Sequence, residues 1–106
     1  MMSKEFYTRK EVLHLLQIEE GLLFSLEKEE IIRPIEKDEL HGELFSFLDL
    51  ERVRLAKLLV EEMDVNLAGV DIILRMRQDM IELRRQFDVI LEDVAKHLEE
   101  LTRKTI

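Results

Sequence analysis

The sequence predicts a mainly α-helical protein: a domain of short helices with a small β-hairpin, followed by one long C-terminal coiled-coil helix. Three glycines and one proline among 106 residues are too few for the many turns of an all-β fold. A hydrophobic content of 46% is too high for a disordered chain. Apolar residues in the last third also recur at helical spacing with no proline between them. We therefore expect a domain over residues 1–70 and a long dimerisation helix over residues 71–106.

The domain is expected to begin with two short helices. Thr8 and Glu11 have the spacing of a capping box, in which each side chain accepts a hydrogen bond from the other residue's backbone N–H. This predicts a first helix up to about Leu16 and a second from about Glu19 to Lys28. The residues of the second helix expected to face inward are Leu22, Leu23 and Leu26. Two helices joined by about three residues form a candidate helix-turn-helix.

A β-hairpin is expected after the second helix. The run Ile31–Ile35 is β-prone, and Pro34 excludes the interior of a helix. The polar stretch from Glu36 to Gly42 would form the tip, and the run Leu44–Phe47 the returning strand. This hairpin would be the wing of a winged helix-turn-helix domain.

Two further helices complete the expected fold. Asp49 is a suitable N-cap for a third helix from about Leu50 to Met63. Asn66 is a suitable N-cap for a fourth helix, which would run without a proline to about Arg103. A helix of about 35 residues extends about 50 Å, which is too long for so small a domain to cover.

The fourth helix carries a heptad pattern. Nine seam positions, at alternating spacings of three and four residues, hold eight apolar residues and His97. The apolar ones are Ile73, Met76, Met80, Leu83, Phe87, Ile90, Val94 and Leu101. We expect them to bury one another in a homodimer, because so short a chain has little else to cover them. The spacing leaves parallel and antiparallel pairing open, and we interpret His97 as a register-setting residue rather than a pH-sensitive one.

The distribution of charge restricts the choice of partner. The formal net charge is −8. Residues 1–44 carry six Lys and Arg against eleven Asp and Glu, giving −5, and residues 45–106 carry ten against thirteen, giving −3. Because nucleic-acid binding depends on cations that neutralise phosphates, the acidic N-terminal half argues against tight DNA binding and favours a basic protein partner.

The sequence also lacks the patterns of a membrane protein or an enzyme. It has no run of eighteen apolar residues, no cysteine, no nucleophile elbow and no Gly-rich phosphate loop. We expect a cytoplasmic protein that is not an enzyme and uses no cofactor. Glu39, His41 and Glu43 alternate and could gather a metal ion, but ordinary loop residues are the preferred interpretation, so no metal site is expected.

The order of the expected elements resembles the MerR superfamily. The segment Asp64–Ile73 is similar to the stretch after the third helix in HspR-type heat-shock repressors and in their chaperone-modulator (CbpM) relatives. Further likenesses are a first-helix start at Tyr7-Thr8, a short strand and proline at Ile31–Pro34, an aromatic after the wing at Phe45, and an aspartate opening the third helix at Asp49. The resemblance implies a MerR-like winged helix-turn-helix and a DNA-binding dimer whose long helices pair antiparallel.

The second helix departs from the pattern of a DNA-reading member. Between Glu19 and Glu30 it holds five glutamates and one lysine, and phosphates would repel such a surface. Chaperone modulators resemble this acidic version, which implies binding to the basic helix face of the J-domain of a DnaJ- or CbpA-like co-chaperone, with inhibition as the expected effect. The partner-binding residues expected on this basis are Glu19, Glu20, Phe24, Glu27, Glu29 and Glu30. For Phe24 itself, a place in the core is the preferred interpretation, and an exposed anchor for the partner is the alternative.

Two alternatives stay open. The first is a DNA-binding transcriptional regulator of the MerR or HspR type, whose cations would have to converge on one face despite the neighbouring glutamates. Those cations would be Lys4, Arg9, Lys10, Lys28, Arg33, Arg52 and Arg54. The second is a purely structural dimerisation module that binds neither partner.

Overall fold

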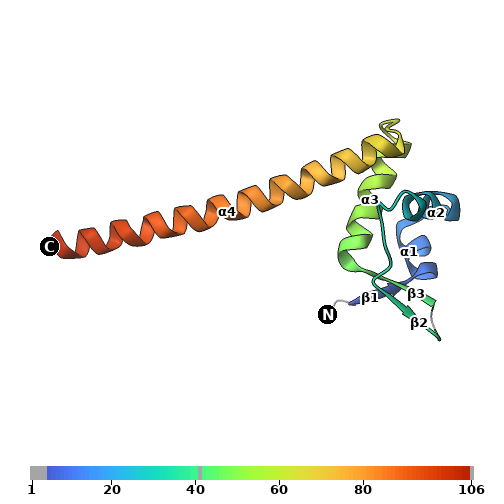
Figure 1. Cartoon of the computed structure of the whole chain (residues 1–106), viewed down its shortest axis with the longest axis horizontal. Coiled ribbons are helices and arrows are strands. Elements are labelled where there is room, and N and C mark those ends of the chain that lie inside the picture. The colour runs from blue at the N-terminus through green and yellow to red at the C-terminus, as the bar shows by residue number, and fades with distance from the viewer. Residues whose placement is uncertain (1–4, 41, 106) are drawn as a thin grey trace. The chain divides into compact units, whose positions relative to one another are not determined.

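The chain folds into helices and a small sheet in the order β1, α1, α2, β2, β3, α3, α4 (Figure 1). The computed structural model describes residues 5–40 and 42–105, with only the backbone described for residues 36–38. The chain divides into two units, residues 1–72 and residues 73–106. We call the first unit the head; the second unit consists of helix α4 from residue 73 onward. The predicted fold class, mainly helical with a small β-hairpin and a long C-terminal helix, is confirmed.

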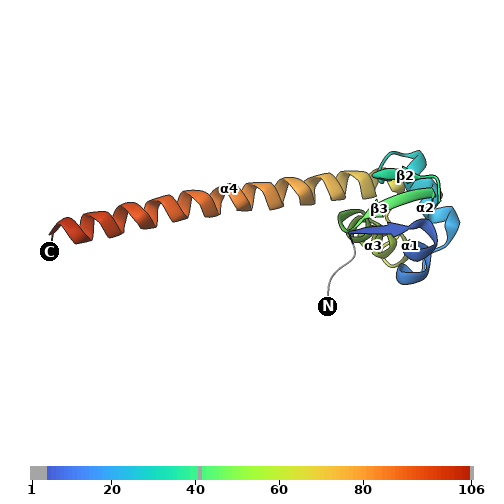
Figure 2. The same ribbon diagram turned by 90° about the horizontal axis from the view of Figure 1, so that it is seen from below.

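Three short strands form one antiparallel sheet in the head. They are β1 (Phe6–Thr8), β2 (Glu36–Asp38) and β3 (Gly42–Ser46), with β3 in the middle (Figure 2). Tyr7 of β1 lies opposite Phe45 of β3, and Lys37 of β2 lies opposite Glu43. Strand β1 was not predicted from the sequence, because three residues are too few to show an alternating pattern.

The first strand of the wing lies further along the chain than predicted. The expected strand over Ile31–Ile35 is wrong, since β2 begins at Glu36. Ile31 and Ile32 are instead buried core residues of the connecting segment, and both of their backbone N–H groups donate to the carbonyl of Leu26. Their β-branched side chains therefore reflect burial in the core and not pairing in a strand.

Helices α1 (Arg9–Leu16) and α2 (Glu20–Lys28) agree with the predicted ones to within one residue. The capping box before α1 is confirmed: the backbone N–H of Glu11 donates to Thr8 Oγ1 at 3.2 Å, and that of Thr8 donates to Glu11 Oε1 at 3.1 Å. Each helix is followed by a residue in the left-handed conformation, Gln17 with φ 51° and Glu30 with φ 59°. Both turns have the two backbone hydrogen bonds of a Schellman motif, in which glycine is the usual residue at this position.

Helix α3 (Phe47–Glu61) begins three residues before its predicted start and ends two before its predicted end. Asp49 is not its N-cap. Ser46 holds that position, and the backbone N–H of Asp49 donates to Ser46 Oγ at 3.1 Å. The Asp49 carboxylate accepts in return from the backbone N–H of Ser46 at 3.2 Å, so the aspartate is the acidic member of a capping box. Asp64, with φ 53°, follows the end of the helix.

Helix α4 (Leu67–Thr105) matches the predicted long helix. The side chain of Asn66 caps it as expected, because its Oδ1 accepts from the backbone N–H of Gly69 at 2.8 Å. A Cβ at Gly69 would lie 2.7 Å from Val65 Cγ1 and 3.3 Å from that Oδ1, so a larger residue there would force the side chain of Val65 to shift. No helix within residues 5–40 and 42–105 combines the length and the apolarity needed to span a bilayer.

The core of the head is built by side chains from all of its helices and from β3. Helices α1 and α2 both contact α3, which lies beside them (Figure 1). Leu23 and Leu26 of α2 are fully buried as predicted, whereas Leu22 is only half-buried. Among the residues that the structure describes, the other fully buried side chains of the head are Val12, Ile32, Phe45, Val53, Ala56 and Val70.

Candidate functional site

The outward face of α2 combines acidic and aromatic side chains. Glu20, Phe24 and Glu27 are four and three residues apart and therefore lie on one side of the helix. Leu23 and Leu26 are buried, and they fix this orientation. Phe24 is 60% exposed, so the interpretation of Phe24 as a core residue is wrong.

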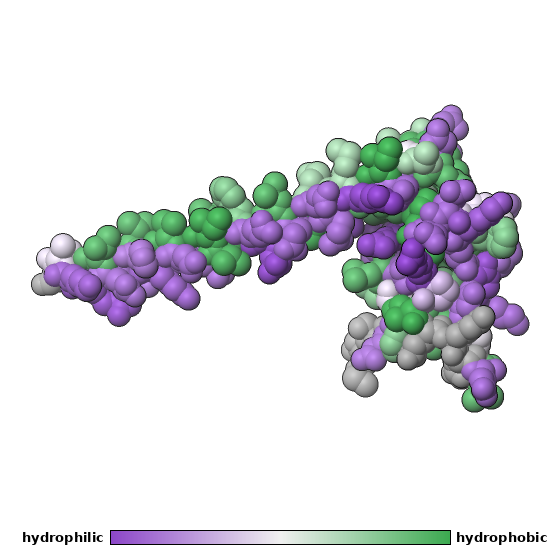
Figure 3. Space-filling view, in the orientation of Figure 1, coloured by the Kyte–Doolittle hydropathy of each residue, from purple (hydrophilic) through white to green (hydrophobic). Residues whose placement is uncertain are grey.

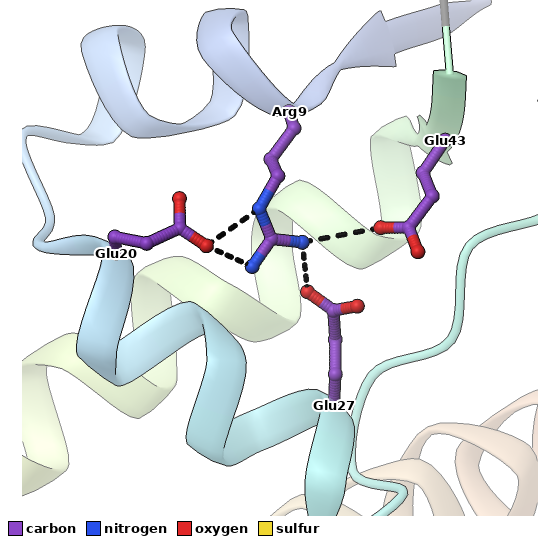
Figure 4. A network of polar contacts seen from close by, with 4 residues as sticks. All are labelled: Arg9, Glu20, Glu27 and Glu43. Carbon is purple, nitrogen blue, oxygen red and sulfur yellow. Dashed lines mark hydrogen bonds and ion pairs between the residues drawn. The ribbon is translucent and has the colours of Figure 1, made fainter.

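One arginine links this face to the wing (Figure 4). Arg9, the first residue of α1, donates from Nε to Glu20 Oε1 at 2.7 Å and from one terminal nitrogen to Glu43 Oε2 at 3.1 Å. The same terminal nitrogen also bonds to the carboxylate of Glu27, and the other one bonds to Glu20. The guanidinium thus joins α1, α2 and β3. The four residues are up to 34 positions apart, and no sequence spacing predicts their meeting.

The network is negative overall, since three carboxylates surround one guanidinium and leave a net charge of −2. Hydrogen bonding to Glu20, followed by hydrogen bonding to Glu27, raises the pKa of Arg9 despite its partial burial. Burial is the main cause that raises the pKa of Glu27, whose side chain is only 18% exposed; Arg9 opposes this rise and Glu43 adds to it. Arg9, the cation that lies among these three carboxylates, is therefore already paired.

A shallow groove adjoins this network. It has a volume of about 450 Å³ and is lined by Arg9, Phe24, Glu27, Gly42 and Glu43. It lies between α2 and the start of β3, so its walls come from the helix-turn-helix and the wing together. An aromatic ring beside unbalanced carboxylates offers both apolar contact and charge to a basic side chain.

The remaining predicted partner-binding residues lie apart from this groove. Glu19 is the residue before α2 and is exposed, but its side chain makes no capping hydrogen bond. Glu29 and Glu30 follow the other end of α2, about 13 Å along the helix from Glu20. Glu30 pairs with Arg33 at 3.1 Å. Glu20, Phe24 and Glu27 therefore share one side of α2, whereas Glu29 and Glu30 lie beyond its C-terminal end and outside the groove.

Several cations of the DNA-binding alternative are engaged in ion pairs within the chain. Arg9 belongs to the network above, Arg33 pairs with Glu30, and Arg54 pairs with Glu51 at 2.7 Å. Lys10, Lys28 and Arg52 are exposed. Lys4 lies outside the described residues. Each of the three ion pairs places a carboxylate beside a cation that phosphate contact would require.

The predicted seam residues of α4 are all exposed, with exposed fractions from 38% for Ile73 to 69% for Met80. Hydrophobic side chains gather along one side of this helix (Figure 3). At about 100° per residue, Leu98 falls within about 20° of Phe87 around the axis, whereas His97 falls about 80° away. Leu91 lies on the same side, and both leucines are exposed.

The exposed apolar residues of α4 offer a second register for the seam, with Leu91 and Leu98 in place of Ile90 and His97. The apolar series continues from Phe87 through Leu91, Val94, Leu98 and Leu101, with spacings of four, three, four and three residues. A strict heptad pattern places residues 90 and 97 in the seam and leaves out Leu91 and Leu98. A pattern that allows two successive spacings of four residues after Leu83 would include both leucines. Ile90 and His97 then flank the seam.

Metal ligation finds no support in the described part of the chain. Among residues 5–40 and 42–105, no three His, Asp or Glu side chains are placed to hold a metal ion together. His41, the central residue of the alternating Glu-x-His-x-Glu pattern, lies outside the described residues.

Comparison with known proteins identifies one family. The family model described as "MerR HTH family regulatory protein" matches residues 7–90 of the 106. The match begins at β1, includes the whole winged helix-turn-helix and extends into α4. No curated protein matches the chain.

Proposed function

Since the chain belongs to the family of MerR helix-turn-helix regulatory proteins, we propose that it acts as a chaperone modulator, an acidic homodimeric adaptor that binds and inhibits the J-domain of a DnaJ- or CbpA-like co-chaperone. One observation carries the proposal. The outward side of α2 presents the exposed Glu20 and Phe24 beside the half-buried Glu27, and Arg9 is already paired with three carboxylates.

The chemistry of the α2 face suits a basic helix. A net charge of −2 around Arg9 attracts cations and steers a basic partner toward the groove. Phe24 supplies an exposed aromatic ring of the kind that dominates interface energies when it becomes buried. The basic face of a J-domain helix, which the resemblance to chaperone modulators implies as the target, would supply the complementary charges.

The same chemistry opposes the backbone of DNA. A helix that enters a groove brings its outward face close to phosphates, and affinity then rests on cations that displace counterions. Glu20 and Glu27 would be repelled there, and Arg9 would have to leave its carboxylate partners. The DNA-binding regulator is therefore the alternative outcome of the test below.

Homodimerisation through α4 is supported by the symmetry of its seam. The apolar positions 73, 76, 80, 83, 87, 91, 94, 98 and 101 have spacings of three, four, three, four, four, three, four and three residues. This series reads the same in both directions and has Phe87 at its centre. In an antiparallel pair with the two-fold axis at Phe87, every apolar position therefore faces another one, such as Ile73 facing the partner's Leu101.

The flanking charges fit the same arrangement. In antiparallel coiled coils each flank of one helix faces the same flank of the other. Arg84 and Asp88 lie on the same flank of the helix, three residues before Phe87 and one residue after it. The two-fold axis would therefore place Arg84 beside the partner's Asp88. On the other flank Asp79 lies eight residues before and His97 ten after, so Asp79 would lie beside the partner's His97. Arg84 and Asp88 carry opposite charges, so their contact would favour this pairing.

The decisive experiment is a calorimetric titration of a purified J-domain into the protein. Binding that weakens as salt is added is the expected result, because the attraction is between charges. The proposal would be wrong if, at tens of micromolar protein, the titration released no heat and the two proteins did not co-elute. A mobility-shift assay with DNA from upstream of the protein's own gene is the parallel arm, and sequence-specific retention there would favour the transcriptional regulator.

A further inference from the structure

The groove beside Phe24 already contains one cation, and that cation belongs to the chain itself. Arg9 lines the groove together with Phe24, Glu27, Gly42 and Glu43. Its side chain is 28% exposed, so the guanidinium can be reached from solvent while it bonds to the carboxylates. The carboxylates of α2 and β3 therefore bind a guanidinium group in this structure, and α1 of the same chain supplies it.

The groove carries more negative charge than Arg9 neutralises. One terminal nitrogen of Arg9 serves both Glu27 and Glu43, and it lies 3.1 Å from Glu43 Oε2. One oxygen of each of these two carboxylates bonds to the guanidinium, and the other points away from it (Figure 4). Burial is the main cause that raises the pKa of Glu27, and the neighbouring Glu43 adds to the rise. A second cation beside the outer oxygens would reduce the repulsion between the two carboxylates.

Phe24 supplies the apolar side of the same groove. It lies one turn of α2 before Glu27, and 60% of its surface is exposed. An aromatic ring attracts a cation to its face, and it can also cover the aliphatic stem of a long basic side chain. The groove therefore has both the charge and the apolar contact that a second cationic side chain requires.

We propose that Arg9 is an internal competitor, which fills part of the groove that receives a cationic side chain of the J-domain. The incoming side chain lies over Phe24 and brings its charge to Glu27 and Glu43. The inference rests on the proposed function and adds the regulation of its site. Arg9 then has two opposite effects: it holds α1, α2 and β3 together, and it lowers the affinity of the groove for a basic partner. Glu43 makes the wing part of the docking surface.

The opposite signs of these two effects provide the test. Wild type and Arg9→Gln are each titrated at low salt with the same purified J-domain of a DnaJ-like co-chaperone. The variant is expected to bind about 3- to 10-fold more tightly although its head is less stable, because the partner meets three carboxylates without their internal counterion. The gain should shrink as salt is added. If Arg9 served only to hold the head together, the affinity would fall with the stability.

Arg54→Gln is the matched control. It removes one positive charge and one ion pair, that with Glu51 at 2.7 Å, from a position outside the groove. The net charge changes by the same amount as in Arg9→Gln, but the affinity for the J-domain should stay within about 2-fold of the wild type. Equal gains in Arg9→Gln and Arg54→Gln would show that overall charge sets the affinity, and they would overturn the proposal.

Glu43→Gln provides a second test, which still decides the question if Arg9→Gln does not fold. It removes one carboxylate of the groove and leaves Arg9 paired with Glu20 and Glu27. The affinity should fall about 3-fold. An unchanged affinity in Glu43→Gln, or an Arg9→Gln variant of native helical content that binds no better than the wild type, would overturn the proposal. A wild-type chain that binds no J-domain would instead reject the proposed function itself, so the two failures are distinguishable.

Discussion

The guanidinium of Arg9 donates a hydrogen bond of 3.1 Å to the carboxylate of Glu43, although 34 residues separate them. Arg9 begins α1 and Glu43 belongs to β3, so this contact ties the helix-turn-helix to the wing. The same guanidinium holds Glu20 and Glu27 of α2 (Figure 4). One side chain thus connects three elements of the head and reduces the negative charge of the network from −3 to −2.

Replacing Arg9 should destabilise the head. In an Arg9→Gln variant, three carboxylates lose their common partner and repel one another. We expect the free energy of unfolding to fall by about 1–3 kcal/mol, the range for hydrogen bonds to charged groups. Urea unfolding at fixed protein concentration measures it. Lys10→Gln removes an exposed cation next in sequence and should change the stability by less than about 0.5 kcal/mol, and equal losses in both variants would contradict the role of Arg9.

Glu27 should give the stability a specific pH dependence. Its pKa is raised in the folded protein, chiefly by burial, so folding favours its protonated form. This contribution is fully present below the ordinary value of 4.5 and is lost as the pH rises through the raised value. Glu27→Gln cannot titrate, so the difference in unfolding free energy between wild type and variant should change in this pH window. A difference that stays constant across the window would show that Glu27 titrates normally.

Gln17 should be a site where glycine stabilises the protein. Its φ of 51° lies in the left-handed region, where a side chain costs about 1–2 kcal/mol. Gln17→Gly relieves this cost but makes the unfolded chain more flexible, so we expect a net gain of about 0.5–1 kcal/mol in urea unfolding. Gln17→Ala keeps a Cβ and should bring no such gain. A glycine variant less stable than the alanine variant would contradict the Schellman assignment.

A matched pair of variants on α4 can decide whether residue 97 or residue 98 belongs to the seam. Leu98→Ala should weaken the proposed dimer strongly, because truncating a buried leucine costs about 2–5 kcal/mol. His97→Ala removes a flanking side chain and should have a much smaller effect. Sedimentation equilibrium over a range of protein concentrations gives both dissociation constants. A larger effect for His97→Ala would restore the strict heptad register, with His97 in the seam.

Phe24 should be the strongest single determinant of J-domain binding. Truncating an aromatic anchor at the centre of an interface costs about 2 kcal/mol or more, which is about 30-fold in affinity. Phe24→Ala should show this loss in calorimetry with an unchanged helical content. Phe47→Ala is the control, because Phe47 is another exposed phenylalanine but begins α3. If both variants bound as tightly as the wild type, the α2 face would not be the docking surface.

Local patterns in the sequence were sufficient for most of the helices. The capping box at Thr8 and Glu11, the cap at Asn66 and the long apolar series of α4 each depend on residues within a few turns of one another. Such patterns reflect hydrogen bonds within one helix terminus and the apolar side of a single helix. The wrong N-cap predicted for α3 is also a local matter. Ser46 and Asp49 form the capping box together, and Ser46, not Asp49, is the N-cap.

The sequence by itself determined that the protein is mainly helical, that α2 is acidic and that α4 carries an apolar stripe with no cover in its own chain. Only the tertiary structure decided that Ile31 and Ile32 belong to the core, that β1 pairs with β3, and that Arg9 meets three carboxylates. These features join residues that are far apart along the chain. Their meeting depends on how whole elements pack together, and no periodicity within one element encodes that packing.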